Sequence, residues 1–398
     1  MKKLFHQLRR RLAKLWLEIN LQLEVIGITG SYGKTTAVYA TASVLSSQYS
    51  VNRTDLNLDT IYNLPITILK TKLWNEILVL EYGVDHRGEM DFHLSLVKPK
   101  IAVLTGITPV HSDSELLGSL KNIIAEKKKL VEAVPAEGLA VFNWDDEWVR
   151  KIGQEHHGRK VFYGLNKDAD VWAEEIKITP EGTNFILHDG QLVLSFKTGL
   201  LGYPAVYACL VAYIIGREKK VEVKNIQQKL AELKPLAGRL SLEAGPLGTV
   251  LLNDAKRANP ASVLAGLKTL TEFPGRKVVV LGEMGELGKM SKILHRQVGE
   301  KIAQMKIDYL VGVGPLTRLV LAAAEKKGMP KKRLLWAADV GEAAEILRPL
   351  LQPGDLLYLK ASLLRHLERV ILLLNGQKVT CKEVVCHNYK PCSDCSRL

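Results

Sequence analysis

The chain has 398 residues, of which 47% are hydrophobic and 24% charged, an ordinary balance for a globular protein of two or three domains. No apolar run approaches the roughly 18 residues of a membrane-spanning helix, and the basic N-terminus lacks the apolar core and cleavage site of a signal peptide, so we expect a cytoplasmic protein. The 55 basic and 42 acidic residues give a net charge of +13, which favours anionic partners, but no basic-aromatic pattern points to nucleic acid.

Residues 2–19 are predicted to form a basic amphipathic helix, and residues 1–24 are treated as a separate N-terminal segment. One side carries apolar side chains at helical spacing, namely Leu4, Phe5, Leu8, Leu12, Leu15, Trp16 and Ile19. The basic residues lie mostly elsewhere, at Lys2, Lys3, Arg9, Arg10, Arg11 and Lys14. Two interpretations stay open: the helix packs on its own domain with a solvated basic face, or it attaches to an anionic membrane surface.

The stretch Gly27–Thr36 has the composition of a phosphate-binding loop. It follows an apolar run at 25–28 that predicts a buried strand, and it leads into a predicted helix at 37–45. A glycine-rich turn at this point exposes backbone N–H groups at a helix N-terminus, which favours an anion. Lys34 would reach the outer phosphates of a nucleotide, and the Thr35 hydroxyl would hold Mg²⁺. The predicted nucleotide-binding residues are Gly30, Ser31, Tyr32, Gly33, Lys34, Thr35 and Thr36.

Two further strands are predicted to end in side chains that could serve the same site. The apolar run 77–80 ends at Glu81, and a carboxylate at the carboxyl end of a parallel strand beside the phosphate loop is well placed to hold Mg²⁺. The run 101–105 leads to His111, which we expect over the same phosphates. Residues 57–65, interrupted by asparagine and proline, are predicted to be a loop.

Strands alternate with helices along most of the chain, and the alternation restarts after Lys234–Arg239. This pattern predicts the α/β class with open, mostly parallel sheets. We expect a phosphate-loop ATPase domain with a mostly parallel sheet at residues 25–237. It is followed by a smaller Rossmann-like α/β domain at 238–378.

The last segment, residues 379–398, is rich in cysteine. It holds Cys381, Cys386, Cys392 and Cys395, with His387 adjacent to the second of them. In a cytosolic protein such a cluster suggests Zn²⁺ before disulfides, because zinc takes four thiolate or imidazole ligands. The spacing matches no standard zinc motif, so a tail without metal stays an alternative.

An ordered set of short motifs runs from about residue 25 to about residue 372. They are Gly-Ser-Tyr-Gly-Lys-Thr-Thr at 30–36, Glu-Tyr-Gly at 81–83 with Gly88 and Glu89, Thr-Gly-Ile…His at 105–111, Glu126-Lys127, Gly238-Arg239, Asp254 with Asn259-Pro260, the run 280–288, and Lys360-Ala361-Ser362. Together they resemble the Mur ligases, the ATP-dependent amide ligases that build the peptidoglycan stem peptide. The run 280–288 and the Asn-Pro pair favour the branch that adds D-alanyl-D-alanine to the muramoyl tripeptide.

The resemblance implies that ATP phosphorylates a muropeptide carboxylate and that an amine, here D-alanyl-D-alanine, attacks the acyl phosphate. Lys34 and the loop amides would hold the outer phosphates, Thr35 and Glu81 would ligate one Mg²⁺, and His111 would ligate a second. Lys127 matches the family lysine that CO₂ carbamylates, which makes it an anionic metal ligand. The implied catalytic residues are Lys34, Glu81, Lys127, His111 and Arg239.

The resemblance assigns further roles to the second predicted domain. Arg239 would sit at a hinge and reach the phosphates on closure, while Asp254 and Asn259 would contact the nucleotide. Lys360 and Ser362 would face the incoming substrate.

Some positions depart from the family pattern. The residues at the helix start that usually hold the nucleoside correspond to Pro204, Ala205 and Ala208, and Lys256 stands where the family has tyrosine. Only 24 residues precede the phosphate-loop strand, so we expect the family's UDP-sugar domain to be absent. Two alternatives are therefore kept: a Mur-like ligase for a lipid-linked or other acceptor, and an inactive nucleotide-binding scaffold in a wall-synthesis complex. We expect a monomer or a complex with a partner subunit, with peripheral contact at the inner face of the membrane through residues 2–19.

Overall fold

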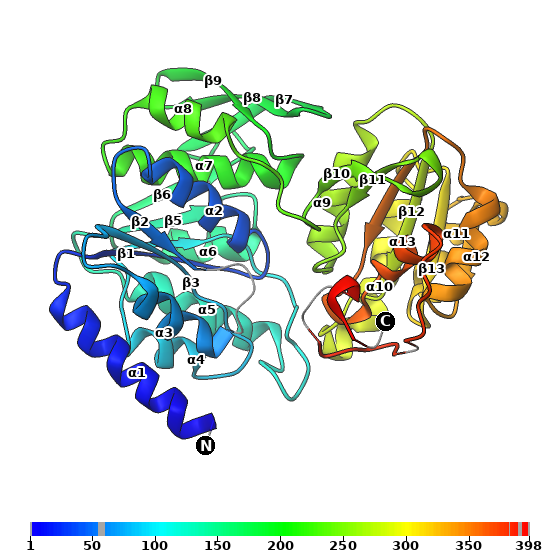
Figure 1. Cartoon of the computed structure of the whole chain (residues 1–398). Coiled ribbons are helices and arrows are strands. Elements are labelled where there is room, and N and C mark those ends of the chain that lie inside the picture. The colour runs from blue at the N-terminus through cyan, green and yellow to red at the C-terminus, as the bar shows by residue number, and fades with distance from the viewer. Residues whose placement is uncertain (1, 55–59, 382, 389–391, 397–398) are drawn as a thin grey trace. The chain divides into compact units, whose positions relative to one another are not determined.

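The computed structural model describes residues 2–54, 60–381, 383–388 and 392–396. It divides into two compact units (Figure 1). One unit comprises Met1–Lys177, Thr183–Gly199 and Pro204–Leu233, and the other comprises Ile178–Gly182, Leu200–Tyr203 and Lys234–Leu398. The domain limits drawn from the sequence, at 24/25, 237/238 and 378/379, stay predictions.

The first unit is built on a nine-stranded sheet with the order β2-β3-β1-β4-β5-β6-β7-β8-β9. Adjacent strands from β2 to β7 are parallel, whereas β8 and β9 pair antiparallel. The strands are β1 (Glu24–Thr29), β2 (Val51–Arg53), β3 (Ile77–Glu81), β4 (Ile101–Leu104), β5 (Leu139–Asn143), β6 (Lys160–Gly164), β7 (Val171–Thr179), β8 (Gly182–Asp189) and β9 (Leu192–Thr198). The central strands are continuous apolar runs because both of their faces are covered.

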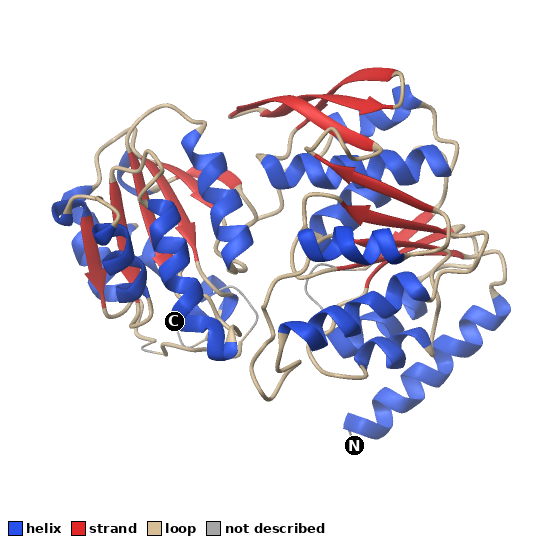
Figure 2. Cartoon of the chain, turned by 180° about the vertical axis from the view of Figure 1, so that it is seen from behind, coloured by secondary structure: helices blue, strands red, loops and turns tan. Residues whose placement is uncertain are grey.

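Helices cover both faces of this sheet (Figures 1 and 2). One face carries α1 (Lys2–Ile19), α3 (Thr60–Lys70), α4 (Glu89–Leu94), α5 (Leu120–Glu132) and α6 (Glu147–Glu155). The other carries α2 (Lys34–Leu45), α7 (Tyr203–Glu218) and α8 (Val223–Ala231). The predicted phosphate loop lies between β1 and α2, as expected.

Helix α1 packs on the first unit, but not through its apolar face. Its inward side consists of His6, Ala13, Trp16, Leu17 and Asn20, which are buried or half-buried. Most of the predicted apolar row points outward instead, with exposed fractions of 61% at Phe5, 53% at Leu8, 47% at Leu12, 54% at Leu15 and 70% at Ile19. Trp16 of that row packs inward, and the side chain of Leu4 lies outside the described residues. The expectation that the helix packs on its own domain is therefore confirmed, but its solvent-exposed side carries most of the apolar row as well as basic residues.

Arg10 explains part of this orientation. Its guanidinium lies 3.7 Å from the centre of the Phe92 ring. The same group donates to the Phe92 carbonyl at 2.6 Å and to the Ser95 hydroxyl. These contacts fix α1 to α4 through a charged residue, which leaves the leucines uncovered.

The loop predicted at 57–65 is also partly wrong, because residues 60–70 form α3 with Pro65 inside it, while residues 57–59 lie outside the described residues. Proline removes one helical hydrogen bond. Leu64 and Ile68, one helical turn apart, are fully buried in the core of the first unit. Burial of this face outweighs the local preference.

The second unit contains a six-stranded sheet with the order β10-β11-β15-β12-β13-β14, parallel except for the β10–β11 pair at its edge. The strands are β10 (Ser241–Ala244), β11 (Val250–Asn253), β12 (Lys277–Gly282), β13 (Tyr309–Val313), β14 (Leu334–Ala337) and β15 (Leu356–Lys360). The helices are α9 (Pro260–Thr271), α10 (Ser291–Ile302), α11 (Thr317–Lys326), α12 (Val340–Leu350) and α13 (Arg369–Leu374). Short 3₁₀ turns are η1 (Pro246–Gly248), η2 (Gly288–Met290), η3 (Lys331–Arg333), η4 (Leu363–Arg365) and η5 (Cys392–Asp394). The two sheets confirm the predicted α/β class.

Among the described residues, none of the helices combines the length and the apolar character that crossing a bilayer requires.

Candidate nucleotide-binding site

Two glycines give the phosphate loop its shape. Gly33 caps α2 in the left-handed conformation, at φ 78°. A Cβ at Gly30 would lie 2.1 Å from the Thr105 hydroxyl oxygen, so a side chain does not fit there. The loop can therefore bring its backbone N–H groups close to a ligand at the N-terminus of α2, where the helix dipole favours an anion.

Lys34, Thr35 and Glu81 come together at the carboxyl ends of β1 and β3. The Lys34 ammonium donates to the Gly30 carbonyl at 2.8 Å and lies 3.9 Å from Glu81 Oε1. The Thr35 hydroxyl donates to Glu81 Oε2 at 2.9 Å. The sheet causes this meeting, since Ile28 of β1 pairs with Glu81 of the adjacent parallel strand. A hydroxyl and a carboxylate oxygen beside a buried ammonium fit Mg²⁺ and phosphate, because Mg²⁺ takes hard oxygen ligands.

Asp146 holds the phosphate loop, a role that sequence reasoning missed. One of its oxygens accepts from Val149 N at 3.0 Å and caps α6. The other accepts from the Tyr32 hydroxyl at 2.8 Å and from Ile107 N at 2.9 Å. Burial first, and then Asp146, raise the pKa of Tyr32 well above its usual value, so the phenol stays a donor. The acidic turn after β5, residues 145–147, was the only sequence signal for this role.

His111 is buried and takes a left-handed backbone conformation at φ 64°. Its Nδ1 donates to the Val84 carbonyl at 3.1 Å. A non-glycine residue in this conformation carries strain, which occurs often at functional sites. In the same segment, Glu89 accepts from the N–H groups of Asp85 and His86 at 2.8 and 3.0 Å. The side chains of Asp85, His86 and Glu89 offer ligand atoms within 4.8 Å of one another.

Lys127 lies on the buried side of α5, and only 1% of it is exposed. Ile123 and Leu130 flank it on the same side of the helix and are fully buried. Its neighbour Glu126 accepts from Met90 N at 2.7 Å and from Lys129 Nζ at 2.8 Å. Lysine is almost never buried so completely unless its charge is compensated. This burial is compatible with a carbamate, which stays a prediction.

In the second unit, Asp254 and Lys360 form a buried ion pair at the ends of β11 and β15. The Lys360 ammonium donates to Asp254 Oδ2 at 2.5 Å, and the Tyr358 hydroxyl donates to the same oxygen at 3.1 Å. Burial raises the pKa of Asp254 and lowers the pKa of Lys360, and their contact opposes both shifts. The resemblance assigned Asp254 to the nucleotide and Lys360 to the incoming substrate, whereas in the structure the two residues contact each other. The positive charge of Arg239 acts on both groups.

Asn259 begins α9 in a capping box. Its side-chain oxygen accepts from Ser262 N at 2.9 Å, and the Ser262 hydroxyl accepts from Asn259 N at 3.0 Å. This contact explains Asn259 structurally, so its nucleotide contact stays a prediction. Ser362 N donates to the Glu283 carbonyl at 3.1 Å, which holds the Lys360–Ser362 segment beside the 280–288 run. A cavity of about 270 Å³ lies here, lined by residues that include Gly282, Glu283 and Arg365.

Phosphate-loop nucleotide-binding proteins are defined by a glycine-rich loop between a parallel strand and a helix. A lysine, a hydroxyl and a carboxylate lie beside that loop, as they do here. The chain belongs to the Mur ligase family. The family model of the Mur ligase middle domain matches residues 28–216, and that of the Mur ligase glutamate ligase domain matches residues 238–363.

The curated relatives are similar along most of this chain. UDP-N-acetylmuramoyl-tripeptide--D-alanyl-D-alanine ligase from Bacillus subtilis is 29% identical, with 91% of this chain and 78% of the relative covered. The enzyme of the same name from Escherichia coli is 30% identical, with 78% of this chain and 68% of the relative covered. Among solved structures, MurF from Acinetobacter baumannii superposes with a TM-score of 0.85 at 26% identity, covering 94% of this chain and 81% of the MurF chain.

Proposed function

We propose that the chain is an ATP-dependent amide ligase of peptidoglycan precursor synthesis. It activates a muropeptide carboxylate as an acyl phosphate and joins it to D-alanyl-D-alanine. The observation that carries the proposal is the meeting of Lys34, Thr35 and Glu81 at the mouth of the phosphate loop, within the segment that matches the middle domain of the family. The names of the relatives supply the reaction and its substrates.

The residues present fit ATP and Mg²⁺. The loop amides and Lys34 would neutralise the outer phosphates, and the oxygens of Thr35 and Glu81, already 2.9 Å apart, would bind the cation. Bound Mg²⁺ would compensate the charge that develops on the transferred phosphoryl group. Catalysis by these side chains is then a matter of position and charge, which is typical of phosphoryl transfer.

The remaining assignments rest on the resemblance to the family. His111 would bind a second Mg²⁺, and its strained backbone supports a functional role. Lys127 would serve as a carbamate, which its burial supports. Arg239, Asp254 and Asn259 would contact the nucleotide.

Turnover of purified protein tests the proposal. The enzyme is supplied with ATP, Mg²⁺, D-alanyl-D-alanine and either UDP-linked or lipid-linked muramoyl tripeptide, and both phosphate release and the product mass are measured. We expect phosphate release that requires both the acceptor and the dipeptide, together with a product heavier by one dipeptide less water. Activity only with the lipid-linked acceptor would select the alternative acceptor. Nucleotide binding without acceptor-dependent turnover would instead support a scaffold.

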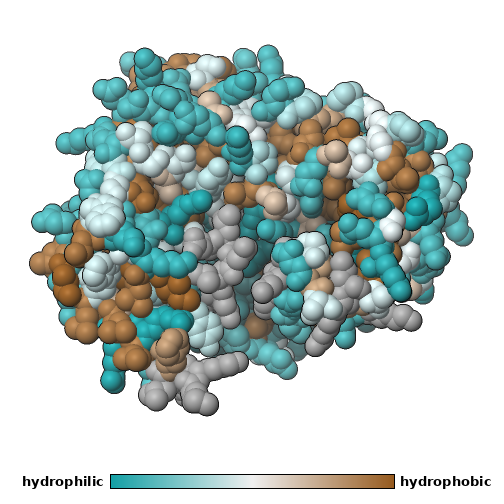
Figure 3. All heavy atoms as spheres, in the orientation of Figure 1, coloured by the Kyte–Doolittle hydropathy of each residue, from teal (hydrophilic) through white to brown (hydrophobic). Residues whose placement is uncertain are grey.

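We also propose that α1 attaches this enzyme to an anionic membrane surface. The outward row of Phe5, Leu8, Leu12, Leu15 and Ile19 is the apolar face of a surface helix whose other side is already packed. Figure 3 shows hydrophobic side chains gathered over α1, at the lower left. At about 3.6 residues per turn, the cations Arg9 and Arg11 border this row on opposite sides. Such a helix can bury its apolar row at the headgroup boundary while its cations meet anionic lipids.

Two more apolar side chains are exposed in the segments before β1 and β3: Leu21 is 84% exposed, and Trp74 is 71% exposed. The two strands that follow pair with each other from their first residues, Glu24 of β1 and Ile77 of β3. The row and these two side chains, together with the net charge of +13, favour an anionic lipid surface as the occupant.

Co-sedimentation with phosphatidylglycerol vesicles tests the attachment, with phosphatidylcholine vesicles for comparison. Leu8→Glu/Leu12→Glu should abolish pelleting, because both side chains point outward and the packed side of α1 stays intact. Val193→Glu on β9 is the matched control, since Val193 is an apolar residue elsewhere that is at least as exposed, at 62% against 53% for Leu8 and 47% for Leu12. The membrane assignment is wrong if neither the intact protein nor the Leu8→Glu/Leu12→Glu variant pellets with the vesicles. It is also wrong if the intact protein instead dimerises through α1.

A further inference from the structure

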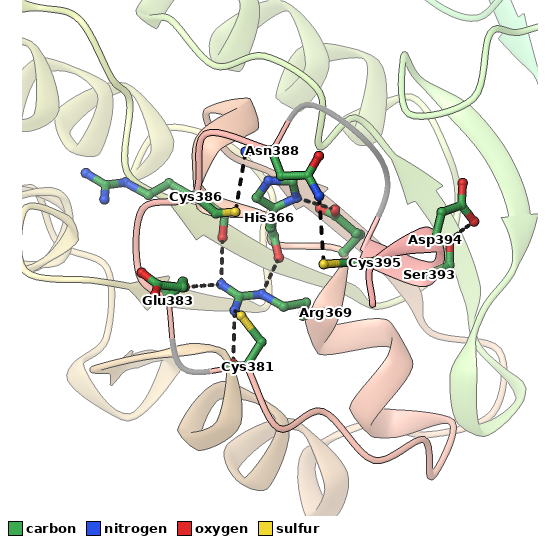
Figure 4. Close-up of polar contacts among 11 residues, drawn as sticks. His366, Arg369, Cys381, Glu383, Cys386, Asn388, Ser393, Asp394 and Cys395 are labelled. Atoms are coloured by element: carbon green, nitrogen blue, oxygen red, sulfur yellow. Dashed lines mark hydrogen bonds and ion pairs between the residues drawn. The ribbon is translucent and has the colours of Figure 1, made fainter. Parts of the chain in front are cut away.

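The cysteine-rich tail is fixed to the end of the second unit by main-chain contacts. Cys386 N donates to the Leu364 carbonyl at 2.9 Å, which joins the tail to η4. Arg369 of α13 donates to the carbonyls of Cys381 and Glu383 at 3.2 and 2.7 Å. The tail thus lies against the segment that follows Lys360–Ser362 (Figure 4).

Two of the tail thiols contact Asn388, and the thiol of Cys392 lies beside His366 and Glu368. Asn388 N donates to Cys386 Sγ at 3.5 Å, and Asn388 Nδ2 donates to Cys395 Sγ at 3.7 Å. The buried Cys392 belongs to a cluster with His366 and Glu368 in which the ligand atoms lie within 4.8 Å of one another. All of these cysteines are free thiols in the structure.

His366 has the features of a metal ligand within this cluster. Its side chain is 1% exposed, and its Nδ1 donates to Glu368 Oε1 at 2.8 Å. Its Nε2 is buried and makes no well-aligned hydrogen bond within the described part of the chain, although the backbone of Asn388 lies beside the ring. An imidazole that shares one nitrogen with a carboxylate and leaves the other for a cation is the usual arrangement of metal-bound histidine. His366 also takes a left-handed conformation, at φ 46° and ψ 51°, a sparsely populated region for a non-glycine residue.

Cys381 lies in a different environment. Its Sγ is 3.7 Å from the Arg369 guanidinium nitrogen Nη1. In Figure 4 its thiol points to Arg369, whereas the thiols of Cys386 and Cys395 point to Asn388. The sequence-based ligand set therefore needs a different fourth member.

We propose that Cys386, Cys392, Cys395 and His366 Nε2 bind one structural Zn²⁺, with Glu368 orienting the imidazole and Cys381 outside the site. Three thiolates and one imidazole are a standard tetrahedral zinc set with no open position. The ion would satisfy the buried nitrogen and tie the tail to η4. The inference does not depend on the proposed ligase activity, because it concerns metal content alone.

Metal analysis of the full chain, purified under reducing conditions without chelators, tests the site. We expect about one Zn²⁺ per chain. Substituting Co²⁺ for it should give thiolate-to-metal charge-transfer absorption. Cys392→Ser and His366→Gln should each lose the stoichiometric metal, while the matched variant Cys381→Ser should retain it. Glu368→Gln should retain the ion at roughly 10- to 100-fold lower affinity, as expected for a residue that only positions a ligand.

Circular dichroism and ATP binding of each variant separate metal loss from unfolding. Should a metal-free variant lose its fold, the wild-type charge-transfer spectrum still identifies three-thiolate ligation. Absence of zinc from reduced wild-type protein would overturn the proposal. Retention of zinc by folded His366→Gln combined with its loss from Cys381→Ser would restore the four-cysteine set and overturn the assignment of His366.

Discussion

The hydroxyl of Thr35 donates to the carboxylate of Glu81 at 2.9 Å, although 46 positions separate the two residues in the chain. The contact joins the first turn of α2 to the carboxyl end of β3. It brings together, at the phosphate loop, the two oxygen ligands that the sequence assigned to Mg²⁺.

Lys34→Ala and Glu81→Gln should each abolish turnover while leaving the protein folded. Both groups act on phosphate or cation, and losing such an electrostatic contact costs about 2–4 kcal/mol in the transition state, on the order of a hundredfold or more in rate. Acceptor-dependent phosphate release measures the loss, and Lys72→Ala, at an exposed site after α3, is the control. Full activity in either variant would contradict the nucleotide-site assignment.

Asp146→Asn should loosen the phosphate loop. The amide oxygen can still cap α6, but the amide NH₂ group cannot accept a hydrogen bond, so the bonds from the Tyr32 hydroxyl and the Ile107 N–H are lost. A lost hydrogen bond to a charged group is worth about 1.5–3 kcal/mol, so the KM for ATP should rise by roughly tenfold or more. Tyr32→Phe removes only one of these contacts and should have a smaller effect. Equal KM values for Asp146→Asn and the wild type would show that Asp146 does not position the loop.

Lys127→Ala should be inactive and partly rescued by formate or acetate, because a small carboxylate can replace the oxygens of a carbamate. Lys128→Ala is the control, since Lys128 is on the same helix and pairs with Glu132 at 3.0 Å near the surface. Carbon-13 NMR of enzyme supplied with labelled bicarbonate should show a carbamate signal that Lys127→Ala lacks. No such signal in metal-loaded, active wild type would refute the modification.

Lys360→Met should destabilise the second unit. Removing one partner of a buried pair leaves the other charge uncompensated and costs about 3–5 kcal/mol. The double variant Lys360→Met/Asp254→Asn should recover part of that loss, because it removes both charges. Thermal unfolding followed by calorimetry measures the difference. If the double variant loses as much unfolding free energy as the two single variants lose together, the two residues act independently.

Arg10→Ala should weaken the attachment of α1 more than Arg11→Ala does. Arg10 stacks on Phe92 and donates to its carbonyl, a combination worth about 1–3 kcal/mol, whereas Arg11 is exposed and its removal should change stability by less than about 0.5 kcal/mol. Hydrogen exchange of the α1 amides reports this directly. Equal protection in the two variants would show that Arg10 does not fix the helix.

The sequence alone determined the features that depend on local pattern. The apolar runs and the glycine-rich turn predicted β1, the phosphate loop and α2. The spacing of apolar residues, the glycines of the turn and the start of the helix all lie within about a dozen residues. The alternation of predicted strands and helices also indicated the α/β class and the βα units of the second unit. Glu81 could be assigned because parallel strands place their carboxyl ends at one edge of the sheet.

Only the tertiary structure decided the features that depend on residues distant in the chain. The pattern of α1 identifies its apolar face but not which face packs against the domain. Here His6 and Ala13 are buried and Arg10 stacks on Phe92, while the leucines stay exposed. Likewise, the four cysteines of the tail suggested a zinc site with ligands from the tail alone. The fold instead brings His366 to Cys392 and Arg369 to Cys381, because the tail returns to α13 and η4 rather than folding on itself.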